Sequence, residues 1–393
     1  MFFCDPPGHT DPEHLFNLGS DSIVEKDYVF MHDQEPVDLD LYRALFDKVF
    51  KHNMDLSSHI TPNDVVWPNA TLKQEFINIL EQKGSGGELF SRHSNDVLDL
   101  YKLNPTVLRT VGHVVVSERG EYVERLCDRY GWKPHYYFYH GWACLDWFRG
   151  YDRAFLIPRA RNRAPIRTFM SPNRIVAGKR DHRVLFLYNV FKNHLEQNHI
   201  SAPRICPAEN VDITSIAQKY TNVYRDITTV FNQANLPRMF ADEDTQHMTS
   251  CWLGNYTEAA DSLVYVPTET VYFGRRTHIT EKTFKAIALE MPFVLVASAG
   301  SLSYLREYGF RTFADVFDES YDLETNDILR IEKVTQLLKD LNNLSVVERQ
   351  QIHLACLPIV EHNYNHFYRG GFADILWKEL TNMLNEFTNL KGL

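Results

Sequence analysis

The chain of 393 residues lacks the long apolar runs that mark membrane proteins. No run approaches the roughly 20 apolar residues needed to span a bilayer. The start, MFFCDPPGHTDPEH, also lacks the basic region and apolar core of a signal peptide. We therefore expect a cytoplasmic protein without a membrane span.

Cysteine is sparse and scattered. The six cysteines form no Cys-x-x-Cys pair and no cluster with zinc-ligand spacing; they are Cys4, Cys127, Cys144, Cys206, Cys251 and Cys356. In a chain of this length, cysteines placed in this way are expected to be reduced thiols in the core or at the surface.

Several catalytic and nucleotide-binding motifs are missing. The absence of a Gly-x-Ser-x-Gly elbow, a Walker A loop and His-Glu-x-x-His argues against hydrolase, NTPase and zinc-protease functions. The absence of Gly-x-Gly-x-x-Gly argues against a dinucleotide site. A hydrophobic fraction of 44% and a charged fraction of 23% are ordinary for a soluble enzyme, and the length favours two domains.

Strand-like runs alternate with helical patterns on both sides of a segment rich in Arg, Pro and Asn. These runs cover Asp27–Met31, Thr110–Ser117, His135–Tyr139, Val184–Tyr188, Leu263–Val266 and Phe293–Ala297. The pattern predicts an α/β fold with two Rossmann-like domains facing a cleft. We expect an N-terminal α/β domain over 1–150, a basic linker over 151–178, and a C-terminal α/β domain with a helical tail over 179–393.

The segment 279–322 carries the most specific signal. It begins as a helix, with Thr280 as a cap and Glu281 and Lys282 in the first turn. A helix N-terminus attracts phosphate through its amides and dipole. Lys282 adds a mobile positive charge, and the Glu281 carboxylate can accept hydrogen bonds from a ribose diol. These properties suit a nucleotide-diphosphate donor.

The same segment reads ITEKTFKAIALEMPFVLVASAGSLSYLREYGFRTFADVFDESYD. It resembles the donor-binding half of two-domain GT-B glycosyltransferases, and more closely a group of phage and bacterial proteins with a TEKTF…PF…G…YLR…GF.TF…DESYD pattern. It is more remotely similar to the α1,3-fucosyltransferases, which have a TEK motif. The resemblance implies a GT-B-like fold, with Glu281 on the donor ribose and Lys282 on a phosphate. It also implies that the domain over 1–150 is the acceptor side and that the domain over 179–393 binds the nucleotide-sugar.

Other residues are predicted to complete the donor site. Arg275 lies on the loop before Thr280, and Glu269 follows a strand, where it can contact the sugar or the nucleoside or belong to a plain turn. Arg180 and Arg183 are predicted to open the first strand of the second domain and to clamp the pyrophosphate. No Asp-x-Asp lies near the donor loop, so we expect no metal and no cofactor, with the nucleotide-sugar as co-substrate.

The acceptor side needs a general base for the acceptor hydroxyl. Asp33 and Glu35 follow the strand at 27–31 in a His-Asp-Gln-Glu-Pro element similar to one in the phage-type group, and His140 follows another strand. The alternatives are a cap for the helix that follows Pro36 and, for the aromatic residues around His140, a place in the core.

The distribution of charged residues does not identify the acceptor. Between residues 149 and 183 ten basic residues face two acidic ones, a local charge of +8 in a chain of net charge −10. This field suits the donor pyrophosphate, a nucleic-acid backbone or an acidic glycan, or is a solvated linker. The acceptor is thus either a glycan or hydroxymethylated phage DNA, as in DNA modification. The alternative function is a non-catalytic protein that binds phosphate or nucleic acid on a GT-B-like fold.

The acidic run in FADVFDESYD has no predicted chemical role. It comprises Asp315, Asp318, Glu319 and Asp322. We interpret it as a solvated turn that fixes packing through Phe313, Phe317 and Tyr321.

Overall fold

A computed structural model describes residues 28–31, 89–91, 113–116, 119–130, 133–148, 160–207, 210–240 and 253–390. The chain divides into two compact units. The first comprises Met1–Trp147 with Ala373–Leu393, and the second comprises Phe148–Phe372.

The first unit holds a parallel sheet with strand order β2-β1-β3-β4. The strands are β1 (Tyr28–Met31), β2 (Leu89–Ser91), β3 (His113–Val116) and β4 (Lys133–Tyr136). Two of the predicted strands in this half, at 27–31 and 110–117, are confirmed as β1 and β3. The strand expected over 135–139 ends earlier, because helix α7 (Tyr139–Phe148) already begins at its last residue.

One helix of the first unit shows its buried face clearly. Helix α6 (Glu121–Tyr130) buries Val123 and Cys127, which lie four residues apart on one face. The C-terminal helix α16 (Gly371–Leu390) also contacts this unit. Its Glu379 carboxylate accepts a hydrogen bond from the Phe138 amide at 3.0 Å and forms an ion pair with Arg119 at 3.1 Å.

The second unit holds a parallel sheet with strand order β6-β5-β9. The strands are β5 (Arg167–Ser171), β6 (His199–Ile200) and β9 (Ser262–Tyr265). The predicted run at 293–297 pairs in parallel beside β9, through bridges at Phe293 and Val296. Since the chain passes from β5 to β6 on one side and later to β9 on the other, the order reverses at β5. Ligands of open parallel sheets bind at the carboxyl edge of such a reversal.

Two predictions about this unit are corrected. The run at 184–188 was expected to be a strand, with Arg180 and Arg183 at its start, but it lies inside helix α8 (His182–Lys192). Every residue from His182 to Phe191 is buried, so the run shows no helical periodicity, and a short apolar run cannot be assigned by period alone. The stretch 151–178, expected to be a connection, contains the central strand β5.

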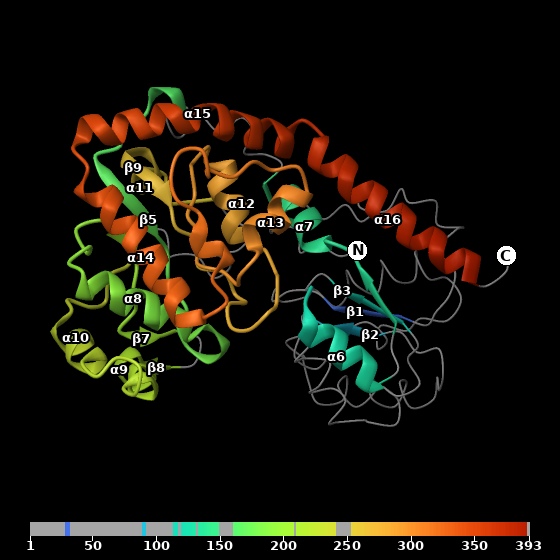
Figure 1. The fold of residues 1–393 in the computed structure, drawn as a ribbon, viewed down its shortest axis with the longest axis horizontal. Coiled ribbons are helices and arrows are strands. Elements are labelled where there is room, and N and C mark those ends of the chain that lie inside the picture. The colour runs from blue at the N-terminus through green and yellow to red at the C-terminus, as the bar shows by residue number, and fades with distance from the viewer. Residues whose placement is uncertain are drawn as a thin grey trace. The chain divides into compact units, whose positions relative to one another are not determined.

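Around this sheet lie short and long helices (Figure 1). The shorter helices are α9 (Ile213–Ala217), α10 (Ile227–Gln233), α11 (Tyr256–Asp261), α12 (Glu281–Ala288) and α13 (Ser301–Glu307). Strands β7 (Ile205–Cys206) and β8 (Val211–Asp212) form a separate antiparallel pair. The longer ones are α14 (Asp327–Asn343) and α15 (Val346–Tyr368). Helix α14 packs on β5 and α8, and α15 packs on α12.

Local signals explain where these helices begin. Thr280 caps α12 by accepting from the Lys282 amide, and Asn326 caps α14 by accepting from the Ile328 and Leu329 amides. Ser345 and Glu348 form a capping box on α15. The predicted helix start at Thr280 is thereby confirmed.

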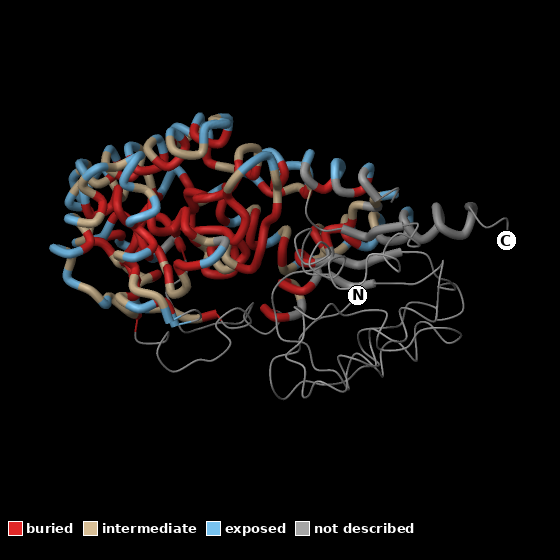
Figure 2. The backbone as a smooth tube through the Cα atoms, turned by 90° about the horizontal axis from the view of Figure 1, so that it is seen from below, coloured by how far each residue is buried: buried red, intermediate tan, exposed pale blue. Residues whose placement is uncertain are grey.

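Buried positions concentrate in the interior of the second unit, and exposed ones lie along its outer helices (Figure 2). Helix and parallel sheet together are compatible with the predicted α/β class. Within the described residues, no helix is long and apolar enough to cross a membrane.

Candidate functional site

The loops that follow β5 and β9 are joined by hydrogen bonds at the carboxyl edge of the second sheet. The Thr268 hydroxyl donates to the Asn173 side-chain oxygen at 2.9 Å, and the Ser171 hydroxyl donates to the Val266 carbonyl at 3.0 Å. All four residues are buried. The strand order of the sheet reverses at β5, so the joined loops lie where open parallel sheets bind ligands.

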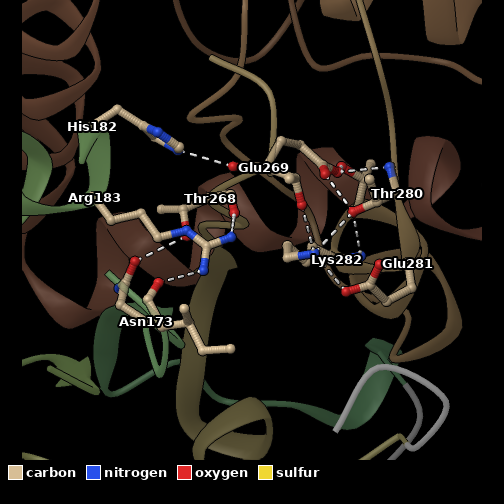
Figure 3. Close-up of polar contacts among 11 residues, drawn as sticks. Asn173, His182, Arg183, Thr268, Glu269, Thr280, Glu281 and Lys282 are labelled. Carbon is tan, nitrogen blue, oxygen red and sulfur yellow. Dashed lines mark hydrogen bonds and ion pairs between the residues drawn. The ribbon is translucent and has the colours of Figure 1, made fainter. Parts of the chain in front are cut away.

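The first turn of α8 is directed at the loop after β9 (Figure 3). His182 Nε2 lies 2.9 Å from the Glu269 carbonyl oxygen, which can only accept, so Nε2 carries the proton. His182 Nδ1 has no hydrogen-bond partner among the described residues, and the ring stacks on Tyr272 at 4.8 Å. Burial, followed by the charge of Arg183, holds the pKa of His182 well below its usual value. The ring is therefore neutral.

Arg183 holds the same two loops together. Its guanidinium donates to the Thr268 carbonyl at 2.7 Å and to the Ile175 carbonyl at 2.8 Å. Only 4% of the residue is exposed, and burial and the neighbouring Arg180 lower the pKa of Arg183 to about 9. Both terminal nitrogens donate to backbone carbonyls, whereas Nε has no hydrogen-bond partner among the described residues, so Arg183 fixes the loops that shape the site.

Glu269 anchors the start of α12. It is fully buried, and its carboxylate accepts from the Thr280 amide at 3.1 Å and from the hydroxyls of Thr280 and Thr283. The anion thus lies at the N-terminus of the helix, where negative charge is favourable. Glu269 therefore satisfies part of the first turn that was expected to meet phosphate.

Lys282 brings a positive charge to this edge (Figure 3). Its ammonium lies 2.6 Å from the Glu281 carboxylate and 3.2 Å from each of the Thr270 and Thr280 hydroxyls. The Lys282 side chain is 24% exposed, whereas that of Glu281 is 6% exposed. The buried carboxylate thus holds the partly exposed ammonium in place, and the two hydroxyls are the partners that an anionic ligand can replace.

The structure gathers several of the predicted donor residues in one hydrogen-bonded region. Glu269, Thr280, Glu281, Lys282 and Arg183 belong to one connected network. Arg180 lies in the short 3-10 helix before α8 (Gly178–Arg180) and is half-buried, while Arg275 is exposed on the loop before Thr280.

The predicted acceptor residues lie in the first unit. Asp33 and Glu35 come just after β1, outside the described residues. His140 is the second residue of α7 and is 3% exposed. Its ring meets Trp147 edge-on at 5.6 Å. His140 thus has the environment of a core histidine.

The sequence reasoning missed three residues of the network: Asn173, His182 and Thr283. Asn173 was missed because 151–178 was interpreted as a connection. Thr268 and Thr270 flank Glu269 directly after a strand, and this position in the sequence predicts that they line the same cleft. His182 and Thr283 offered no such signal, because their partners are distant in sequence.

The basic segment does not form one charged surface within the described residues. Arg163 is 3% exposed and donates to the backbone carbonyls of Leu289 and Glu290. Burial lowers the pKa of Arg163 to about 10. Like Arg183, Arg163 stabilises the fold through hydrogen bonds to backbone carbonyls. Two of the ten basic residues are therefore not available to a polyanion.

The described residues contain no group of three or more His, Cys, Asp or Glu side chains that could hold a metal ion. No protein-family model matches the chain, and no curated protein matches it either. The function must therefore be argued from the site itself.

Proposed function

We propose that the chain is a glycosyltransferase that moves a sugar from a nucleotide-sugar to an acceptor hydroxyl. The observation that carries the proposal is Lys282, a partly exposed ammonium in the first turn of a helix at the carboxyl edge of a parallel sheet, where the strand order reverses. This is the position at which open α/β sheets bind nucleotides, and the charge suits a diphosphate.

The surroundings of Lys282 support a donor site. Arg180 and Glu281 both act on the charge of Arg183, so a half-buried guanidinium and a carboxylate lie around the same buried cation. Cations can bind the pyrophosphate, and the carboxylate can accept from a ribose diol. In this proposal the two units adopt the GT-B arrangement, and Asp33 or Glu35 supplies the base.

The donor is identified first by thermal shift with UDP, GDP, CMP and their sugars. A ligand present at 100 times its dissociation constant stabilises the native protein by about 2.7 kcal/mol. With the matching nucleotide-sugar, turnover is then measured for Glu281→Ala and Lys282→Ala.

We expect Lys282→Ala to lower kcat/KM by about 10- to 100-fold, since a hydrogen bond to a charged group contributes about 1.5–3 kcal/mol. The matched control is Lys285→Ala, which removes the same charge one turn further along α12. Wild-type turnover in both the Glu281 and Lys282 variants would remove the donor-site assignment. Nucleotide binding without any turnover in the wild type would instead favour the non-catalytic alternative.

The acceptor is tested separately. The burial of Arg163 and Arg183 on backbone carbonyls weakens the case for a phosphate-tracking surface and favours a glycan over DNA. Duplex DNA containing hydroxymethylcytosine is titrated at low and moderate salt. Binding that falls steeply with salt would establish the DNA acceptor, and no binding even at low salt would exclude it.

A further inference from the structure

A cavity lies in the same unit, and none of its lining residues belongs to the candidate donor site. It has a volume of about 810 Å³ and is formed by α13, the segment 310–323 and Ile359 of α15. This volume is in the range of small-molecule pockets, about 300–1,000 Å³. The acidic run that the sequence left without a role provides much of its wall.

Glu319 is the buried polar group of this cavity. Its side chain is 7% exposed, and one carboxylate oxygen accepts from the Phe313 amide at 2.6 Å. The other oxygen, Oε2, has no hydrogen-bond partner among the described residues, and the Arg306 guanidinium stands 3.6 Å away. Burial raises the pKa of Glu319. The ion pair with Arg306 is too long to be a hydrogen bond, so a ligand that donates a hydrogen bond to Oε2 gains from the site.

The rim offers both donors and acceptors. Arg311 and Asp315 are exposed, and within the described residues their side chains make no hydrogen bond or ion pair. Arg306 is 46% exposed and donates to the Thr312 hydroxyl at 2.8 Å. Two guanidiniums and a carboxylate thus surround the buried Glu319.

The mixture of charges limits the class of ligand. The cavity is lined by four carboxylates and two guanidiniums, so a phosphorylated or acidic ligand meets net repulsion. A purely cationic ligand would leave the exposed Arg311 side chain without an acceptor. A hydroxyl both donates and accepts, and it therefore suits neighbouring carboxylates and guanidiniums at once. Leu323 lines the cavity and is 76% exposed, so its apolar side chain can meet the C–H face of a sugar ring.

We propose that this cavity binds a neutral saccharide, with Glu319 Oε2 accepting from a sugar hydroxyl and Arg311 and Asp315 binding further hydroxyls at the rim. The site is distinct from the donor site and does not depend on the proposed transferase activity.

The test uses saturation-transfer NMR on the full chain with maltotriose, lactose and the disaccharide of N-acetylglucosamine, and with glucuronic acid as the acidic comparison. We expect at least one neutral sugar to bind, and glucuronic acid to bind at least tenfold more weakly. Glu319→Gln should weaken the neutral sugar about tenfold, because an amide donor replaces the acceptor at Oε2. Asp315→Asn, at an exposed position where folding is not at risk, should weaken it about threefold.

Two controls make the result specific. Asp340→Asn removes an exposed carboxylate on α14 outside the cavity and should leave sugar affinity unchanged. Lys282→Ala should also leave it unchanged, so failure of the donor proposal and failure of this one can be told apart. The proposal is overturned by no binding of any neutral probe, by equal binding of glucuronic acid, or by unchanged affinity in both the Glu319 and Asp315 variants.

Discussion

Helices α8 and α12 both follow a strand of the second parallel sheet and begin at the same edge, but their first turns serve different purposes. In α8 the first-turn residues His182 and Arg183 are buried and bind backbone carbonyls of the neighbouring loops. In α12 the Glu269 carboxylate binds the start of the helix through the Thr280 amide. Lys282 in the first turn remains partly accessible, with 24% of its side chain exposed. The comparison indicates that one helix start builds the site and the other supplies its charge.

The largest expected effect is on the anchor of α12. Glu269→Ala removes the acceptor of three buried donors, from Thr280 and Thr283, and each unsatisfied donor costs about 1–3 kcal/mol. We expect the free energy of unfolding to fall by about 4 kcal/mol, measured by urea denaturation. Glu269→Gln, which keeps one acceptor oxygen and the side-chain size, should lose less than half of that. A loss below about 1 kcal/mol for the alanine variant would contradict the anchoring role.

The next effect tests whether the start of α8 is structural. Arg183→Met leaves the Thr268 and Ile175 carbonyls without their donor, and we expect a loss of about 3 kcal/mol in the free energy of unfolding. Arg180→Met, three residues earlier, should change stability by less than about 0.5 kcal/mol, because Arg180 is half-buried and makes no side-chain hydrogen bond or ion pair within the described residues. Equal losses in the two variants would show that burial does not distinguish these arginines.

A smaller effect depends on pH. The pKa of His182 is lowered in the folded protein, so below about pH 6.5 the unfolded chain binds a proton that the folded chain does not. Stability should therefore fall as pH drops below this value, with a contribution of about 1.4 kcal/mol per pH unit. His182→Gln should remove this part of the slope, measured by urea denaturation between pH 7 and 5. His353 and His366, whose pKa values are also lowered, contribute equally to both proteins. An identical slope in the variant would refute the neutral buried ring.

The smallest effect concerns donor affinity. Arg180→Ala should weaken nucleotide-sugar binding about fivefold, because a partly exposed cation contributes up to about 1 kcal/mol. Arg180→Lys keeps the charge and should retain most of the affinity, measured by calorimetry. Unchanged affinity in the alanine variant would restrict the phosphate contact to α12.

Sequence reasoning predicted the elements whose signals are local. Thr280, Glu281 and Lys282 form a cap and first turn that can be recognised without any distant partner, and β1, β3 and β9 were predicted from their apolar composition. It failed for α8, where burial on all sides removes the period that identifies a helix. It also missed β5, whose central place in the sheet depends on pairing with strands 29 and 95 residues away.

The sequence alone determined that a capped helix with an acidic and a basic residue in its first turn follows the strand at 263–266, because capping and β-propensity act over a few residues. Only the tertiary structure decided which charged residues support the fold and which remain accessible. Glu269, Arg183 and Lys282 all carry a charge, yet two are buried against partners and one is partly exposed. Burial and hydrogen bonding depend on segments brought together by folding, and no local pattern encodes them.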